Sequence, residues 1–283
     1  MTRKEKEMSF KCKTVKTNFH MHTTFADGKN NAEEMILAAI ENGGEAVGFS
    51  EHGYTPIDHS WCMMPDTTEE YVKEIRSLIP KYADKIKVYC GIEADYYTVF
   101  DRSKFDYVIG SVHYVEKEGF YIPMDKSIKD TKDGVNKYYG GDGTALVKDY
   151  FSLVADVVRK TDADIIGHLD VIYKFNEKDP YFDETGKELT KIATDAIDAL
   201  LPYGKPFEIN TGAISRGYRT EAYPNDYFLN LIREMGGSLT YSSDAHDARY
   251  VFLGFDEAVR RAKNAGFKSF KKLTPNGWVD EEI

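Results

Sequence analysis

The sequence predicts an α/β protein built on a parallel β-sheet, with its functional groups at the carboxyl ends of the strands. Short apolar runs alternate with helical patterns along the chain, and this alternation is typical of βα units. Several runs, such as Val47–Phe49 and Asp164–Ile166, are almost continuously apolar, as expected of strands covered on both faces. A length of 283 residues allows one large domain or two small ones, and α/β barrels often reach this size as one domain. We therefore expect a single domain over residues 1–283.

Seven runs of β-branched or apolar residues are predicted to be strands. In chain order they are Thr17–His20, Ala46–Ser50, Lys87–Glu93, Tyr107–Val112, Asp164–His168, Pro206–Asn210 and Ser238–Ser243. Helical patterns separate most of them, as the crossover between parallel neighbours requires.

Six helices are predicted from start and stop signals. Asn31–Glu34 resembles a capping box and opens the first helix, which ends at Gly43–Gly44. Thr67–Glu70 opens the second helix in the same way, and the last two helices end at Gly236 and Gly266. The helices are Ala32–Asn42, one from Thr67 to about Tyr82, Thr144–Lys160, Leu189–Leu201, Asn225–Met235 and Asp256–Ala265.

The least regular part of the chain is the segment 116–143, between the fourth and fifth predicted strands. It contains Asp-Gly and Gly-Gly pairs, which favour turns, and several tyrosines. Long loops in compact domains are usually functional or mobile. We therefore expect one long excursion near the active-site face.

The composition limits the class of partner and the compartment. The net charge is −10 and the pI is about 5.3, which disfavours a protein that holds a nucleic-acid backbone. The three cysteines, Cys12, Cys62 and Cys90, are too few and too scattered for a disulfide framework, as is usual in a reducing cytoplasm. Residues 1–7 are charged and lead into no secretory apolar segment, and no run approaches the roughly 18–20 apolar residues of a membrane span. We expect a cytoplasmic protein without a membrane partner; its oligomeric state stays open.

Every predicted strand runs into His, Asp, Glu or Asn at its carboxyl end. The residues concerned are His20, His22, Glu51, His52, Glu93, His113, His168, Asp170, Glu208, Asn210, Asp244 and His246. His20 and His22 are two positions apart, so in a strand they share a face and can bind one ion. The carboxyl ends of parallel barrel strands open onto one face, which gathers the whole set there.

Such a cluster indicates a metal site. Without a cation, buried imidazoles and carboxylates would suffer desolvation and mutual repulsion. Mixed nitrogen and oxygen ligands suit zinc, with iron or manganese as alternatives, better than magnesium or calcium. The set exceeds what one tetrahedral site can use, so we expect two or three divalent ions.

These residues resemble the PHP family (polymerase and histidinol phosphatase) of phosphoesterases, most closely its monofunctional histidinol-phosphate phosphatases. The matching segments are Phe19–Thr23 with Asp27–Gly28, Ser50–Gly53, Gly91–Glu93, Gly110–His113, Gly167–Asp170, Glu208–Thr211 and Ser243–His246. The resemblance implies a distorted, TIM-like barrel of seven βα units with a trinuclear metal centre.

The resemblance also implies how the ligands are shared among three metals. The first site would use His20, His22, Glu93 and Asp244. The second would use Glu93 as a bridge, with His113 and His168, and the third would use Asp27, His52 and His246.

The chain departs from the family pattern in three places. Asn18 stands where the family usually has an aspartate that orients a histidine, and Glu51 stands where it usually has aspartate. An arginine often follows the fifth-strand motif in related phosphatases, but this chain has Tyr173–Phe175 there.

The implied activity is hydrolysis of a phosphate monoester, most closely histidinol phosphate in histidine biosynthesis. Two or more metals would bind the phosphate oxygens and lower the pKa of a bound water. Catalytic roles are expected for Glu93, Asp244, His246 and Arg216. Arg216 is included because a guanidinium can bind two phosphate oxygens at once. The expected substrate contacts are Arg216, Arg219, Lys174, Trp61 and Tyr121, and the excursion also offers Tyr114, Phe120 and Asp125 to the substrate's ammonium and imidazole groups.

Other functions remain open at this point. The substrate could be another small phosphate ester, namely a nucleotide, a sugar phosphate or a phosphotyrosine. The cluster could also belong to a metal-binding module without catalysis. A measurement of turnover would distinguish such a module from an enzyme. No cysteine is followed by the arginine that a cysteine phosphatase needs, and no glycine-rich phosphate loop occurs.

Overall fold

Seven parallel strands form the central sheet in the computed structural model, which describes residues 16–184 and 186–283. In spatial order they are β1 (Thr17–Asn18), β2 (Ala46–Phe49), β3 (Lys87–Asp95), β4 (Tyr107–Ser111), β7 (Ile165–Ile166), β8 (Phe207–Asn210) and β9 (Leu239–Ser242). Each neighbouring pair is parallel. The charged N-terminal segment and Cys12 lie outside the described residues.

The sheet curls until its two edge strands meet. Met21, just after β1, forms a parallel bridge with Ala245, just after β9. The backbone N–H of His22 donates to the carbonyl of Ala245 over 2.9 Å, and the N–H of Ala245 donates to His20 over 3.3 Å. The result is a distorted, nearly closed barrel of seven strands, which confirms the expected fold class. β1 is shorter than predicted, since His20 and His22 follow it.

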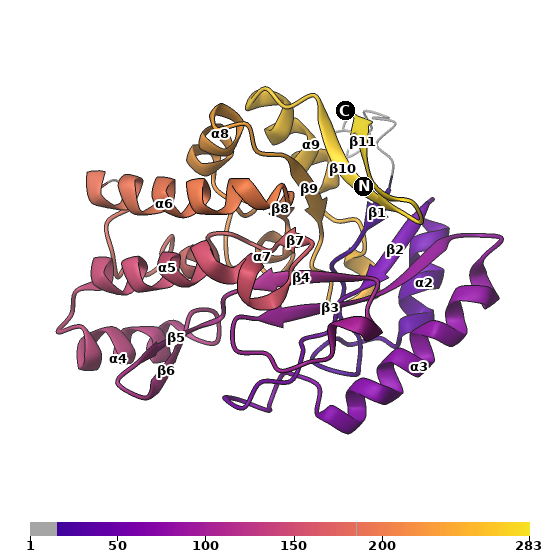
Figure 1. The fold of residues 1–283 in the computed structure, drawn as a ribbon, viewed down its shortest axis with the longest axis horizontal. Coiled ribbons are helices and arrows are strands. Elements are labelled where there is room, and N and C mark those ends of the chain that lie inside the picture. The colour runs from indigo at the N-terminus through magenta and orange to yellow at the C-terminus, as the bar shows by residue number, and fades with distance from the viewer. Residues whose placement is uncertain (1–15, 185) are drawn as a thin grey trace, which may run out of the picture.

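The six predicted helices are present and lie outside the strands (Figure 1). They are α2 (Ala32–Glu41), α3 (Pro65–Tyr82), α5 (Gly143–Thr161), α6 (Lys187–Leu200), α8 (Asp226–Glu234) and α9 (Phe255–Asn264). Asn31 and Glu34 form the expected capping box of α2. α3 begins at Pro65 instead of Thr67, because the fixed φ of proline suits a first helical position.

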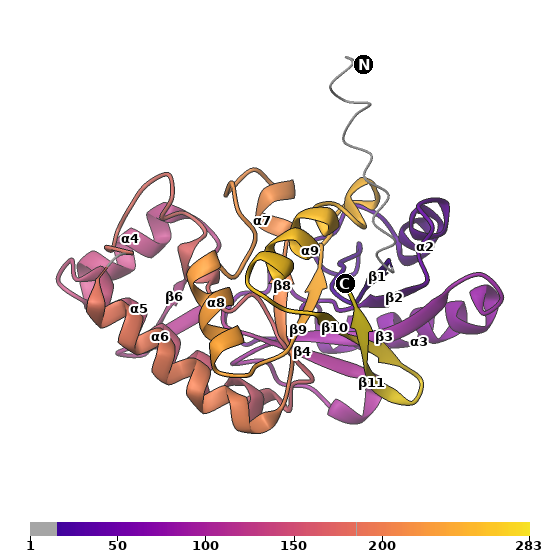
Figure 2. The same ribbon diagram turned by 90° about the horizontal axis from the view of Figure 1, so that it is seen from above.

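The helices lie around the barrel in chain order, with α8 and α9 near β8 and β9, between the α5–α6 side and the α2–α3 side (Figure 1). α2 and α3 cover the side of β1 to β3, while α5 and α6 run next to each other on the other side (Figure 2). Shorter helical turns are α7 (Gly212–Ser215) and the 3₁₀ turns Arg102–Lys104, Val171–Tyr173, Leu201–Tyr203 and Ala248–Tyr250. None of the described helices is both long enough and apolar enough to cross a bilayer.

The excursion 116–143 is more regular than predicted. β5 (Tyr114–Lys117) and β6 (Phe120–Pro123) form an antiparallel hairpin, and α4 (Ile128–Tyr138) follows it. α4 escaped prediction because it is mostly polar and buries only Thr131, Gly134 and Val135. Gly134 belongs to an Asp-Gly pair that suggests a turn, but it lies within α4. A Cβ there would come within 2.5 Å of Ile122, so glycine allows the helix to pack this closely on β6.

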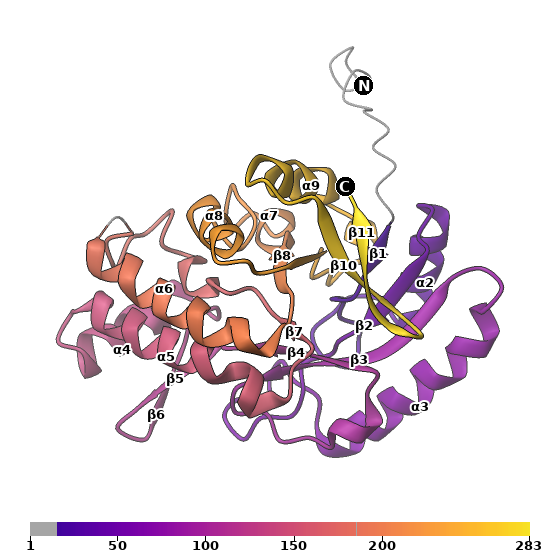
Figure 3. The same ribbon diagram turned by 45° about the horizontal axis from the view of Figure 1, so that its top comes forward.

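A C-terminal hairpin, also not predicted, covers the apolar interior. It consists of β10 (Ser269–Thr274) and β11 (Gly277–Glu282) and packs beside β9 (Figure 3). The Trp278 ring meets the ring of Phe19 edge to face at 6.4 Å. The buried cluster there contains Phe19, Ala46, Tyr107, Ile109, Ile165 and Leu273.

Tyr107 sets the spacing of the strands that carry the site. Its hydroxyl lies 2.6 Å from the carbonyl oxygen of Phe19 and 3.1 Å from that of Phe49. A Cβ at Gly48 or Gly91 would come within 2.3 Å of the Tyr107 side chain. Glycine is therefore required on both neighbouring strands, which explains the glycine that precedes Glu93 by two positions.

Candidate metal centre

Glu93, near the carboxyl end of β3, lies at the centre of the predicted cluster. Its Oε2 atom is 3.2 Å from His20 Nε2 and 2.9 Å from His52 Nδ1. Its Oε1 atom is 2.9 Å from His168 Nε2 and 3.5 Å from His113 Nε2. The four histidines follow four different strands, so the parallel sheet brings them together. One carboxylate faces all of them, in the position expected of a bridging ligand.

Asp244, after β9, provides a second carboxylate. Its Oδ1 atom lies 3.2 Å from His22 Nε2 and 3.7 Å from His20 Nε2. The backbone of Asp244 has φ of 47°, in the left-handed region that few residues adopt. Together with Glu93, these residues form the group expected for the first metal.

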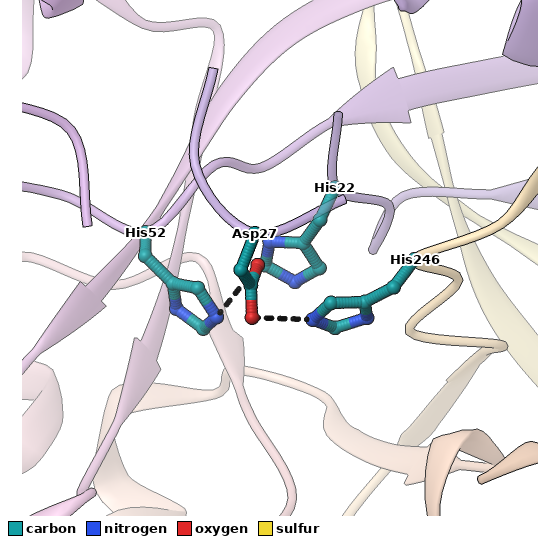
Figure 4. Close-up of side chains that lie close together, drawn as sticks. All are labelled: His22, Asp27, His52 and His246. Carbon is teal, nitrogen blue, oxygen red and sulfur yellow. Dashed lines mark ion pairs between the residues drawn. The ribbon is translucent and has the colours of Figure 1, made fainter. Parts of the chain in front are cut away.

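A further group forms around Asp27 (Figure 4). Its Oδ2 atom is 3.2 Å from His246 Nε2, and its Oδ1 atom is 3.8 Å from His52 Nε2. The His22 ring stacks at 4.3 Å on both the His52 ring and the His246 ring. His22 therefore also faces the group expected for the third metal, which the sequence assigned to the other three residues alone.

Asp27 is held on a tight turn that packs against the first motif. The N–H of Gly28 donates to the carbonyl of Thr23 over 2.9 Å. A Cβ at Gly28 would lie 2.5 Å from the carbonyl oxygen of His22. Only glycine allows this approach, and the turn thereby aims Asp27 at the histidines.

The donor atoms fit divalent metals. His20 Nε2, His22 Nε2 and His52 Nδ1 are buried and have no hydrogen-bond partner among the described residues. Burial, followed by the nearby His246 and His52, lowers the pKa of His22 to about 3, so its imidazole is neutral and able to coordinate. Burial alone would raise the pKa of Glu93, but His20 and other histidines outweigh it and hold that pKa well below the usual range. The neutral imidazole of His22 and the ionised carboxylate of Glu93 are donors of the kind that zinc takes.

Glu208, on β8, orients the first ligand. Its Oε1 atom lies 2.6 Å from His20 Nδ1, and its Oε2 atom accepts the N–H of His168 over 2.9 Å. Asn18 does not contact the His20 ring: its Oδ1 atom accepts the backbone N–H groups of His20 and Ser243 over 3.2 and 3.3 Å. Asn18 therefore does not orient a histidine ring as the aspartate of the family pattern does, because its side chain ties two backbone segments together. Glu208 takes that role.

Glu51 serves the backbone of the first motif. Its Oε1 atom accepts the N–H of Thr23 over 2.6 Å, while its Oε2 atom stays 3.9 Å from His22 Nδ1. Burial raises the pKa of Glu51 well above its usual range. Glu51 thus supports the metal-binding strand end without belonging to any of the metal-ligand groups found in the described residues.

Replacing Glu208 by glutamine is expected to weaken metal binding by about 10–100-fold, as loss of a hydrogen-bonded partner of a metal-bound histidine typically does. The amide can no longer hold the Nδ1–H of His20 through a charged acceptor. Metal retained per chain after dialysis against graded chelator measures the effect. Glu188→Gln, on the exposed face of α6, is the matched control. Equal retention by both variants would contradict the role given to Glu208.

A cavity of about 250 Å³ opens next to the ligands. Arg216, after α7, lines it: one guanidinium nitrogen lies 2.9 Å from Asp244 Oδ2, and the other lies 3.0 Å from the Asp244 carbonyl and 2.9 Å from His246 Nδ1. The other lining residues outside the ligand set are Ser60, Trp61, Tyr114, Asp125, Lys126, Val171, Lys174, Tyr218 and Tyr223. Arg216 is thus where the sequence expected a phosphate-binding cation.

Besides Arg216, the expected substrate contacts Trp61 and Lys174 line this cavity, as do Tyr114 and Asp125 of the excursion. The Trp61 ring packs edge to face on the His52 ring at 4.5 Å, and its Nε1–H donates to the Tyr114 hydroxyl over 2.8 Å. Lys174 is only 8% exposed, and its Nζ atom donates to the carbonyl of Asp125 over 2.8 Å.

Two expected contacts lie elsewhere. Arg219 is 8% exposed, absent from the cavity lining, and donates to the carbonyl of Tyr173 over 2.6 Å. Tyr121 lines a second, more open cavity and packs against the ring of Tyr97 at 5.0 Å. The structure therefore does not support substrate contacts for Arg219 and Tyr121. The guanidinium of Arg219 is bound to the carbonyl of Tyr173 instead, and Tyr121 lies on β6, where it faces the second cavity.

Four further cavity residues could not be identified from sequence patterns, namely Ser60, Lys126, Tyr218 and Tyr223. They come from loops that approach the cavity only in the folded barrel. No spacing rule relates such residues to the strand-end motifs.

Comparison with known proteins places this geometry among related chains. Residues 18–212 match the model of the PHP domain. A relative from Schizosaccharomyces pombe, named probable histidinol-phosphatase, is 31% identical over 265 residues, which is 86% of this chain and 83% of that protein. The histidinol-phosphatase of Lactococcus lactis subsp. lactis is 28% identical over 89% of this chain and 92% of its own length. The crystal structure of histidinol phosphate phosphatase from that organism, with zinc, L-histidinol and phosphate, has a TM-score of 0.69 at 24% identity and covers 93% of this chain and 98% of that one.

Proposed function

The chain belongs to the PHP family, and on that basis we propose that it is a metal-dependent phosphate monoester hydrolase that acts on histidinol phosphate. The single observation that carries the proposal is the convergence of eight histidine and aspartate side chains around Glu93, beside a cavity of small-molecule size. The names of the relatives supply the substrate. A role in histidine biosynthesis, a cytoplasmic location and the absence of a nucleic-acid partner are parts of the same proposal.

Three ligand groups would hold the metals. The first is His20, His22, Glu93 and Asp244, the second is Glu93, His113 and His168, and the third is Asp27, His52 and His246. Bound divalent ions, with zinc as the first candidate, supply charge for the phosphate oxygens and activate the attacking water.

The remaining residues position the ester and its surroundings. Arg216 fixes the carboxylate of Asp244 and the ring of His246, and it turns its guanidinium toward the cavity, where it can bind phosphate oxygens. Lys174 offers a second, nearly buried cation in place of the arginine that is common in related phosphatases. Trp61 covers the ring of His52 and shields it from water. Asp244 and His246 contact Arg216 at the edge of the cavity that would hold the phosphate.

The alternatives fit the cavity less well. The end of a nucleic-acid strand is a poor match for a cavity of about 250 Å³ in a chain with a net charge of −10. A module that only stores or senses metal needs no cations beside its ligands, yet Arg216 and Lys174 both line this cavity. A different small phosphate ester remains the closest competitor.

Steady-state hydrolysis of histidinol phosphate, p-nitrophenyl phosphate, a sugar phosphate and a nucleoside monophosphate tests the proposal, with metal content measured on the same sample. We expect kcat/KM for histidinol phosphate to exceed the others by about a hundredfold, which corresponds to roughly 2.7 kcal/mol. Similar slow rates on all four would refute the substrate assignment. No turnover by the metal-loaded protein would refute the enzyme assignment.

A further inference from the structure

One carboxylate that lines the active-site cavity does not belong to the expected metal ligands. Asp27, Glu93, Asp125 and Asp244 all line the cavity. Three of them face the histidines of the metal groups, whereas Asp125 is in none of the groups found among the described residues. Once bound metals neutralise the other three, Asp125 is the remaining negative charge on this wall of the cavity.

Asp125 is held in place from its backbone side. It lies between β6 and α4, and its carbonyl accepts the Nζ–H of Lys174 over 2.8 Å. Its Oδ2 atom is 3.7 Å from the same Nζ atom, longer than a hydrogen bond, and its side chain is 32% exposed. Lys174 also lies over the ring of Tyr218 at 4.5 Å. The carboxylate is therefore fixed in position while its oxygens remain accessible from the cavity.

A negative charge at this place is a cost for most phosphate esters. The phosphate must approach the metals, Arg216 and Lys174, and Asp125 lies beside Lys174, where it repels a phosphate dianion. The cost becomes a gain when the same substrate carries a positive charge a few bonds from its phosphate. An ammonium group on the neighbouring carbon would meet Asp125 while the phosphate meets Lys174.

The geometry points to Asp125 as the specificity-determining residue that selects phosphate esters with an adjacent ammonium group. This inference rests on the proposed function, because histidinol phosphate is such an amino alcohol ester. Asp125 and Lys174 then form a charge pair complementary to a zwitterionic substrate, and Asp125 disfavours esters that bring only negative charge.

The test compares two substrates that differ in one group. Imidazolylpropyl phosphate keeps the imidazole and the phosphate of L-histidinol phosphate but has hydrogen in place of the ammonium group. We expect the wild-type protein to prefer L-histidinol phosphate in kcat/KM by about 10–100-fold, the range for loss of one hydrogen bond to a charged group. In Asp125→Asn this preference should fall to within about threefold, mainly through KM for L-histidinol phosphate.

The ratio of kcat/KM for the two substrates shows whether Asp125 selects the ammonium group or only holds Lys174 in place. If Asp125 only positions Lys174, Asp125→Asn slows both substrates equally, and the inference is wrong. Asp133→Asn is the control, because Asp133 is an exposed residue of α4 that pairs with Lys129 outside the site; it should keep the wild-type ratio. Calorimetry gives a second readout: Asp125→Asn should weaken binding of L-histidinol by about tenfold, whereas binding of inorganic phosphate, which Asp125 repels, should become no weaker.

Failure of the proposed function would look different. In that case the wild-type protein hydrolyses neither imidazole ester faster than p-nitrophenyl phosphate, before any variant is compared. A wild-type protein that hydrolyses both imidazole esters equally well retains the proposed function and overturns the role of Asp125.

Discussion

Glu93→Gln is expected to reduce kcat/KM for histidinol phosphate by about a thousandfold or more. Both oxygens of Glu93 are used, with Oε2 facing His20 and His52 and Oε1 facing His168 and His113. Glutamine keeps one oxygen and turns an NH₂ group toward imidazole nitrogens, so it cannot bridge two ions. Loss of several kcal/mol of charge stabilisation gives this factor at about 1.4 kcal/mol per tenfold. Kinetics and metal content of the same sample measure it.

Two matched variants keep this prediction specific. Ser111→Ala removes only the hydroxyl that donates to Glu93 Oε1 over 2.7 Å and should cost far less activity. Glu188→Gln makes the same chemical change on the exposed face of α6 and should have no effect. A Glu93→Gln protein with full metal content and more than about a tenth of the activity would contradict the bridging role.

Most of the site residues that could be predicted from the sequence lie at the carboxyl ends of the strands. The carboxyl ends of all strands in a parallel barrel lie on one face. Once the strands were identified, His20, His52, Glu93 and His168 were therefore expected to lie close together. The types of side chain then indicated a metal, since buried imidazoles and carboxylates need a cation. Both inferences use local patterns and one rule of topology, and the nine expected ligands lie together in the structure.

Residues outside the strand ends could not be placed in this way. Arg216 and Arg219 are three positions apart in one loop. Arg216 lines the cavity, whereas Arg219 is buried and donates to the carbonyl of Tyr173. Asp125 reaches the site because α4 and the β5–β6 hairpin order a segment that looks like a loop in the sequence. Such positions depend on how a loop packs against the folded barrel. The hydrophobic periodicity of the sequence does not predict that packing.

The role of Glu208 shows a limit of a different kind. Its segment was matched as a motif, but the sequence did not reveal whether it binds a metal or a ligand. The 2.6 Å contact with His20 Nδ1 leaves Nε2 of that ring for the metal. That choice between two ring nitrogens is set by three-dimensional neighbours.

Removal of the metals is expected to cost stability as well as activity. Glu93 and Asp244 are almost fully buried, and without metals only histidines and Arg216 offset their charges. One ion present at a thousand times its Kd contributes about 4 kcal/mol to the folded state. At about 2–4 °C per kcal/mol for a chain of this size, chelation should lower Tm by about 10 °C or more. Thermal unfolding with and without zinc measures the difference, and readdition of zinc should restore both Tm and turnover.

The gain in Tm from zinc should also grow as the pH rises from about 6 to about 8. Burial alone would lower the pKa of His20, but Glu208, Glu93 and Asp244 outweigh it and raise that pKa well above 6.5 in the metal-free protein. A histidine with a raised pKa stabilises the metal-free fold at low pH, and this contribution is lost as the pH rises through the folded-state pKa. A metal must displace that proton, so zinc competes poorly at low pH and well at high pH. A zinc effect on Tm that is constant or falls with rising pH would show that His20 is not a ligand.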